Sequence, residues 1–178
     1  MKRSLAILAI AFFALVLQGS AARVLPPAVC PDFGLLLSVA LGISLRNTAA
    51  GVGLAAGIGY LSDLLSGSLL GQHMLLRMAA FAAARVGSRK LNLRGAAPLA
   101  IFAASLSVAD AYGLFALVLF FAGAQAPPPP LPLEVAVQAV VTGVLAPFVS
   151  AGVRRLSHSL GDEEGARLMR LEPRRFPA

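Results

Sequence analysis

The sequence predicts an all-α fold, a polytopic membrane helix bundle of about six transmembrane helices. Of the 178 residues, 58% are hydrophobic and only 13% are charged, whereas a soluble domain usually has about 25% charged residues. The mean hydropathy is +0.81. The apolar residues fall into runs, several close to the roughly 20 residues that a spanning helix needs. The length therefore allows about six spans with short loops and no soluble domain.

The first two predicted spans flank a proline-rich loop. Basic residues precede the apolar run Leu5–Leu17, which reaches Leu25 if Arg23 extends to the interface. This segment also fits a secretory signal peptide, so either a retained span or a cleaved leader is compatible with it. The second run, Phe33–Leu45, is short for a span. It fits a short helix better than a re-entrant segment, because Arg46 then lies on the cytoplasmic side.

The third and fourth predicted spans form a hairpin. The third, Ala49–Leu65, contains four glycines, Gly51, Gly53, Gly57 and Gly59. They include the pair Gly53-x-x-x-Gly57, a pattern that lets two membrane helices approach closely, so we expect close packing here. A tight turn at Ser66-Gly67-Ser68 leads into the fourth, Leu70–Val86.

The fifth and sixth predicted spans are Ala97–Gly123 and Leu133–Val153. A polyproline linker, Gln125–Pro130, joins them and should be stiff. The expected organisation is a six-span membrane domain over residues 1–156, followed by a charged tail over 157–178 that we expect to be cytoplasmic and partly disordered.

The basic residues predict the orientation. The net charge of +7 could suggest nucleic acid. The charges lie between apolar runs and at the two ends, however, so anionic lipid is the expected partner and nucleic acid is not. With both termini in the cytoplasm, Arg23 lies outside, Arg77 lies within the membrane, and the remaining 13 of 15 bases face inward: Lys2, Arg3, Arg46, Arg85, Arg89, Lys90, Arg94, Arg154, Arg155, Arg167, Arg170, Arg174 and Arg175.

Three charged residues fall inside predicted spans and need an explanation. Asp63 and Asp110 lie about 20–22 Å above the inner ends of their helices, and Arg77 about 10 Å below the outer end of its own. In a core about 30 Å thick all three share the outer half. Each such charge costs about 2.5–3.5 kcal/mol unless it pairs or lines a cavity. We expect Arg77 to bridge Asp63 and Asp110; the alternatives are a partner or ligand site and a transport path.

The sequence contains no catalytic or metal-binding motif. Neither GxSxG nor HExxH is present, and His73, one turn from Arg77, is expected to be a local hydrogen-bond partner. The single cysteine, Cys30, excludes an intramolecular disulfide. We therefore expect a protein that is not an enzyme and uses no cofactor or metal.

The hairpin resembles a known family. The segment from Gly57 to Gly71, with His73 after it, resembles the central signature of the MreD family of rod-shape-determining proteins. That signature is a glycine-rich helix ending in G-x-x-x-D-(L/x)-x-S-G-x-x-x-G, and the matching positions are Gly59, Asp63, Ser66, Gly67 and Gly71. Pro31-Asp32 before the second apolar run resembles the family's second-helix entry. The six-span plan also agrees, whereas the polyproline linker and the charged tail depart from the family.

The resemblance implies a subunit of the cell-elongation (rod) complex in the bacterial inner membrane. Such proteins associate with MreC, and through it with MreB filaments, the RodA glycosyltransferase and the elongation penicillin-binding protein. The family is similar in fold to the vitamin-binding S components of energy-coupling-factor transporters, and such an S component is the alternative function. The absence of Trp and of an Ala-x-x-x-Ala pair in the first helix count against that alternative.

Overall fold

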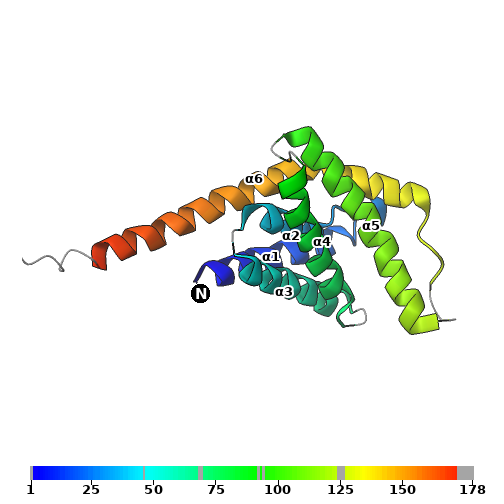
Figure 1. The fold of residues 1–178 in the computed structure, drawn as a ribbon. Helices are drawn as coiled ribbons and strands as arrows, with labels where there is room; N and C mark the ends of the chain where they lie inside the picture. Colours follow the sequence, from blue (N-terminus) through cyan, green and yellow to red (C-terminus); the bar gives the residue numbers. More distant parts are fainter. Residues whose placement is uncertain are drawn as a thin grey trace, which may run out of the picture.

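In the computed structural model, every element of regular secondary structure in the described residues is a helix, as predicted. It describes residues 2–45, 47–67, 70–91, 93, 95–123 and 127–171, with backbone only for 2–4, 27, 122 and 157–171. Six α-helices and one short 3₁₀ helix follow one another along these residues (Figure 1). They are α1 (Lys2–Ala21), η1 (Pro27–Val29), α2 (Phe33–Ser44), α3 (Thr48–Ser66), α4 (Gln72–Lys90), α5 (Ala96–Ala122) and α6 (Pro132–Leu171).

Helix α2 is the centre of the bundle. It has only 12 residues, yet its run from Gly34 to Gly42 is buried throughout. It packs against α1, α3, α4, α5 and α6. One side joins a core formed with α1, α3 and Phe81, and the other joins a core formed with α4, α5 and α6. The expected short helix is therefore confirmed, and its neighbours cover it on every side.

Helices α2 and α3 each begin at a residue whose side chain caps the helix. Asp32 caps α2 by accepting a hydrogen bond from the Leu35 N–H at 2.9 Å, and Asn47 caps α3 by accepting one from the Ala50 N–H at 3.2 Å. Such caps satisfy backbone donors that have no partner within the helix.

Glycines set the close approaches, but not the pair expected from the sequence. A Cβ at Gly53 would meet nothing within 4 Å, and one at Gly57 would meet only the Leu8 side chain at 3.1 Å. The α3–α4 contact instead uses Gly51, which lies against the Phe81 ring, and Gly59, which lies against the backbone of the first turn of α4. The predicted close packing is therefore confirmed at Gly51 and Gly59 and wrong at Gly53, while Gly57 lies against Leu8 of α1.

Helices α5 and α6 pack closely against each other, and α5 touches the rest of the bundle much less. Gly143 allows this, since a Cβ there would lie 2.7 Å from the Ala100 carbonyl oxygen. Ile101 and Phe120 of α5 are 71% and 81% exposed. Helix α6 continues through Pro147 and past residue 156 to Leu171 without a break (Figure 1). The described part of the tail is helical as far as Leu171, residues 172–178 lie outside the described part, and partial disorder of the tail stays a prediction.

Three helices are long and apolar enough to cross a membrane. They are Thr48–Ser66, Ala96–Phe121 and Pro132–Leu156, and the apolar helices Leu5–Ala21 and Phe33–Ser44 are shorter. Helix α4 carries buried and terminal polar groups that lower its hydropathy. Spans for α1, α2 and α4 therefore stay predictions.

Candidate functional site

The Asp63 carboxylate caps the first turn of α4. Its Oδ2 accepts hydrogen bonds from the Gly71 N–H at 2.8 Å and the Met74 N–H at 3.3 Å. Its Oδ1 accepts one from the His73 N–H at 2.9 Å and also contacts His73 Nδ1 at 2.9 Å. Gly71, at the N-cap position of α4, has no side chain to do this. Asp63, 1% exposed, thus supplies the acceptor oxygens that the start of a helix needs.

The neighbouring glycines make this capping possible. Gly67 ends α3 in the left-handed conformation (φ 64°) and its N–H donates to the Asp63 carbonyl at 3.1 Å. Gly71 also has positive φ (102°), a conformation that costs other residues free energy. A Cβ at Gly59 would collide with Met74 Cα and lie 2.5 Å from the His73 carbonyl oxygen. Four of the five signature positions, 59, 63, 67 and 71, therefore shape the turn between α3 and α4.

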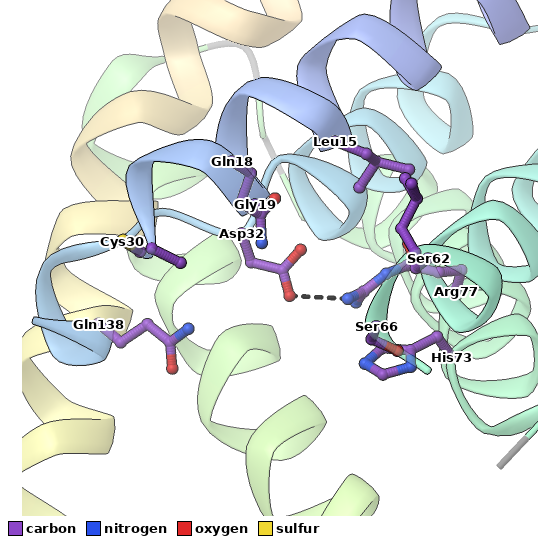
Figure 2. Close-up of a pocket in the computed structure, with 12 residues that line it drawn as sticks. Leu15, Gln18, Gly19, Cys30, Asp32, Ser62, Ser66, His73, Arg77 and Gln138 are labelled. Carbon is purple, nitrogen blue, oxygen red and sulfur yellow. Dashed lines mark hydrogen bonds and ion pairs between the residues drawn. The ribbon is translucent and has the colours of Figure 1, made fainter. Parts of the chain in front are cut away.

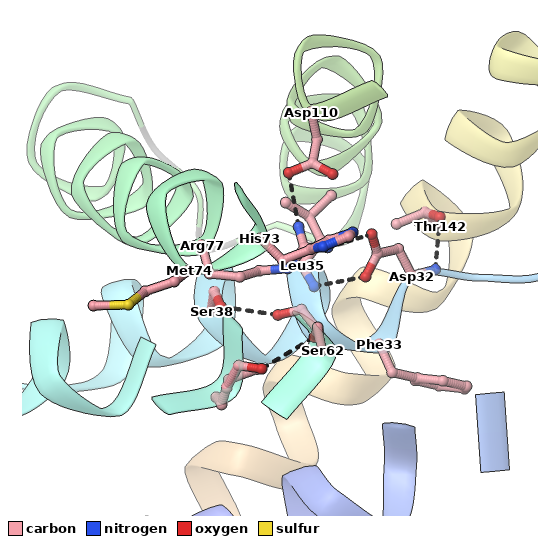
Figure 3. Close-up of polar contacts among 12 residues, drawn as sticks. Asp32, Phe33, Leu35, Ser38, Ser62, His73, Met74, Arg77, Asp110 and Thr142 are labelled. Carbon is pink, nitrogen blue, oxygen red and sulfur yellow. Dashed lines mark hydrogen bonds and ion pairs between the residues drawn. The ribbon is translucent and has the colours of Figure 1, made fainter. Parts of the chain in front are cut away.

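Arg77 bridges two carboxylates, but Asp63 is not one of them. Its NH1 donates to Asp110 Oδ1 at 2.7 Å and its NH2 donates to Asp32 Oδ2 at 2.7 Å (Figure 3). The predicted Arg77–Asp110 pair is present. The predicted bridge to Asp63 is wrong, because both Asp63 oxygens face the start of α4 and the loop before α2 brings Asp32 to the guanidinium instead.

Asp32 connects four parts of the fold. While one carboxylate oxygen caps α2, the other receives Arg77. Its N–H donates to the Thr142 hydroxyl of α6 at 3.4 Å, and the N–H of the next residue, Phe33, donates to Gln18 Oε1 of α1 at 3.0 Å. The proline-rich loop therefore holds α1, α2, α4 and α6 together around one ion pair.

In the Asp32–Arg77–Asp110 triad the arginine is buried and the two carboxylates are partly buried. The Arg77 side chain is 2% exposed, that of Asp32 15% and that of Asp110 10%. Removing one partner of a buried ion pair typically costs about 3–5 kcal/mol, because a charge is left uncompensated. With both carboxyls ionised, the triad carries one more negative than positive charge.

A partly open cavity of about 280 Å³ lies beside the triad (Figure 2). Its walls come from α1, the loop between α1 and α2, α3, α4 and α6, and many of its side chains are polar. Its lining residues are Leu15, Gln18, Gly19, Ala22, Cys30, Asp32, Ser62, Leu65, Ser66, His73, Arg77 and Gln138. Polar groups of a predominantly apolar chain thus gather at one place.

Sequence reasoning places the charges at one level but misses Asp32 and the cavity. Hydropathy assigns Asp32 to a loop outside the membrane, although an aspartate directly before an apolar run is a helix-start signal. The expected role of His73 as a local hydrogen-bond partner is confirmed by its contacts with Asp63.

Comparisons of this chain with models of protein families, with curated proteins and with solved structures give no match.

Proposed function

We propose that the chain is a non-enzymatic subunit of the bacterial cell-elongation complex, embedded in the inner membrane and acting through an MreC-like partner. The observation that carries this proposal is the hairpin from Gly59 to Gly71. Its residues match the MreD signature, and each has a structural role. Gly59 allows close approach, Asp63 caps α4, and Gly67 and Gly71 form tight turns. A signature with these roles suits a scaffold that presents a fixed surface to partners.

The proposed topology has six membrane-crossing helices with both termini in the cytoplasm. The distribution of basic residues supports it. So does the arrangement in Figure 1, where the N-terminus and the far end of α6 lie toward the same side of the molecule. The hairpin turn then faces outward, and the extended end of α6 reaches the cytoplasm.

The partner surface is proposed to include α5. This helix leaves several large apolar side chains exposed, among them Ile101, Tyr112 and Phe120. In a bilayer such a face contacts either lipid or a partner helix. Association with a partner helix is driven by van der Waals packing. Through this contact the protein would help to organise MreB filaments, RodA and the elongation penicillin-binding protein.

Affinity purification from native membranes tests the proposal. The tagged chain should co-purify an MreC-like coiled-coil protein and peptidoglycan-synthesis enzymes. A tagged Asp63→Ala chain, in which the hairpin cap is lost, should lose those partners. Recovery of ATPase subunits in their place would overturn the proposal.

The alternative function is a substrate-binding S component of an energy-coupling-factor transporter. The partly open cavity beside Asp32 and Arg77 is the specific observation that favours it, since a substrate needs a cavity with polar groups. A neighbouring reading frame for ATPase subunits would favour this alternative, and one for an MreC-like protein would favour the rod complex.

A further inference from the structure

We propose that a second cavity, between the start of α4 and the end of α5, binds the ester carbonyl and the adjoining acyl chain of a membrane phospholipid. This proposal goes beyond the cell-elongation complex and requires only that the helices lie in a membrane. Three observations support it: a buried glutamine without a hydrogen-bond partner, an apolar lining, and a position at the ends of two helices.

The second cavity has a volume of about 360 Å³ and shares no lining residue with the cavity beside the triad. One glutamine, one glycine and four large apolar residues line it: Leu70, Gly71, Gln72, Leu75, Leu117 and Phe121. Leu70, Leu75 and Phe121 are also exposed on the outside of the bundle. The apolar walls of the cavity therefore continue into the apolar outer surface of the protein.

Gln72 contributes the one polar side chain of this lining. It is 5% exposed, and its Nε2 makes no hydrogen bond within the described part of the chain. A buried amide N–H is unfavourable unless it finds an acceptor. The last torsion of a glutamine side chain is broad, so the amide can turn an N–H toward an acceptor that enters the cavity. A ligand of this cavity should therefore carry a hydrogen-bond acceptor.

The backbone on both sides of Gln72 is held in place. Asp63 accepts hydrogen bonds from the N–H groups of Gly71, His73 and Met74. The turn that carries Gln72 cannot move away from the cavity without breaking these bonds. This part of the wall is therefore formed before a ligand arrives, which lowers the free-energy cost of binding.

The lining favours a ligand that is mostly hydrocarbon. None of its six residues carries a charge, so a charged group would enter without a partner. The apolar side chains favour an apolar body, and the single amide requires one acceptor. An ester carbonyl at the start of an acyl chain combines the two, because its oxygen accepts a hydrogen bond and the chain beyond it is apolar.

The position of the cavity along the helices agrees with an ester group. The apolar segment of α5, Ala96–Phe121, has 26 residues and therefore spans about 39 Å. The hydrocarbon core is about 30 Å thick, so the ends of such a helix reach the interfacial layer. Phe121 ends this segment and Gln72 begins α4. Lipid ester groups lie at the same depth, where the acyl chains join the headgroups.

Ester-linked and ether-linked phospholipids test the carbonyl directly. The full chain is purified in detergent, and its melting temperature is followed while phosphatidylcholine with ester links, or its ether-linked analogue without the carbonyl, is added. The ester lipid should reach half of its stabilising effect at a concentration about fivefold lower than the ether lipid, as one hydrogen bond allows. The same preference should hold for the phosphatidylglycerol pair, since no charge lines the cavity.

Two glutamine variants show where the carbonyl binds. Gln72→Leu should abolish the preference for the ester lipid. Without added lipid it should melt no lower than the parent, because leucine leaves no unpartnered amide. Gln138→Leu is the matched control, the same exchange at a glutamine outside this cavity, and should keep the preference. A preference that survives Gln72→Leu, or a parent chain that does not distinguish the two lipids, would overturn the proposal.

A second pair of variants tests the cavity without changing the amide. Leu75→Trp should fill the space and abolish the preference for the ester lipid. Leu119→Trp, at an exposed leucine of α5 outside the lining, should keep it. If Gln72→Leu does not fold, this pair decides, since both leucines are exposed and tolerate a larger side chain. Equal lipid preference in the two tryptophan variants would show that the ester does not bind in this cavity.

Discussion

Arg77 and Asp32 are 45 positions apart in the chain, yet the Arg77 NH2 and the Asp32 Oδ2 lie 2.7 Å from each other. Asp32 belongs to a loop that starts α2, and Arg77 lies in the second turn of α4. The pair therefore ties the central helix of the bundle to the hairpin. The same guanidinium reaches Asp110 with its other terminal nitrogen, which adds α5 to the connection.

Loss of the Arg77 charge should destabilise the protein severely. Arg77→Gln leaves Asp32 and Asp110 buried without a cation, and we expect a loss of about 3–5 kcal/mol in the free energy of unfolding. Arg89→Gln, an exposed change on the same helix, is the control and should stay within about 0.5 kcal/mol of the parent. Reversible unfolding in mixed micelles measures both, and similar stabilities of the two variants would contradict the buried bridge.

Double-mutant cycles should separate the true partners of Arg77 from Asp63. We expect Arg77→Gln to couple with Asp32→Asn and with Asp110→Asn by about 1–3 kcal/mol, because these residues share direct contacts. Its coupling with Asp63→Asn should be less than half as large. A charge exchange, Arg77→Asp with Asp110→Arg, should not rescue stability, since Asp32 would then face a second carboxylate. Rescue by that exchange would show that Asp32 is not in the bridge.

The Asp63 cap should be worth more than an ordinary helix cap. Asp63→Ala leaves three N–H groups at the start of α4 without their acceptor, so we expect a loss of about 3 kcal/mol or more. Asn47→Ala removes a single exposed cap bond and should cost about 1 kcal/mol. The free energies of unfolding of the two variants are compared under one condition. Equal losses would mean that the three bonds to Asp63 add nothing beyond one ordinary cap.

Two glycines of α3 should respond oppositely to alanine. A methyl group at Gly59 collides with the backbone of His73 and Met74, which cannot move without displacing the cap, so we expect a loss of more than about 2 kcal/mol. At Gly53 a methyl group meets open space, and alanine should stabilise the helix by up to about 1 kcal/mol. The melting temperatures of the two variants in the same detergent test this prediction. Destabilisation by Gly53→Ala would show that a neighbouring group packs closely against Gly53.

The helical content of the chain could be predicted from its runs of apolar residues, and the charges inside them indicated a buried cluster. The pair of Arg77 with Asp110 was predicted as well, but the second carboxylate that meets Arg77 could not be. Asp63 and Asp32 both precede a helix start, and only the packing of α2 in the centre of the bundle decides that Asp32 turns inward. Asp32, which hydropathy assigns to an external loop, thus pairs with an arginine inside the bundle.

The glycine pattern shows a second limit of the sequence. Spacing by four residues identifies a helix face that can be approached closely, but it does not say what approaches it. Gly51 and Gly59 lie eight residues apart, also on one face, and that face meets α4. The cavity beside the triad could not be foreseen either, because its walls come from four separate helices and the loop between α1 and α2.

The position of Asp32 in the chain also bears on how the protein is made. Translation produces residue 32 well before residue 77, and residue 110 only later. When α4 emerges from the ribosome, the arginine can therefore meet a carboxylate already in place. Asp32 can therefore neutralise Arg77 before α5 is synthesised. The second ion pair, with Asp110, forms once α5 has packed against α4.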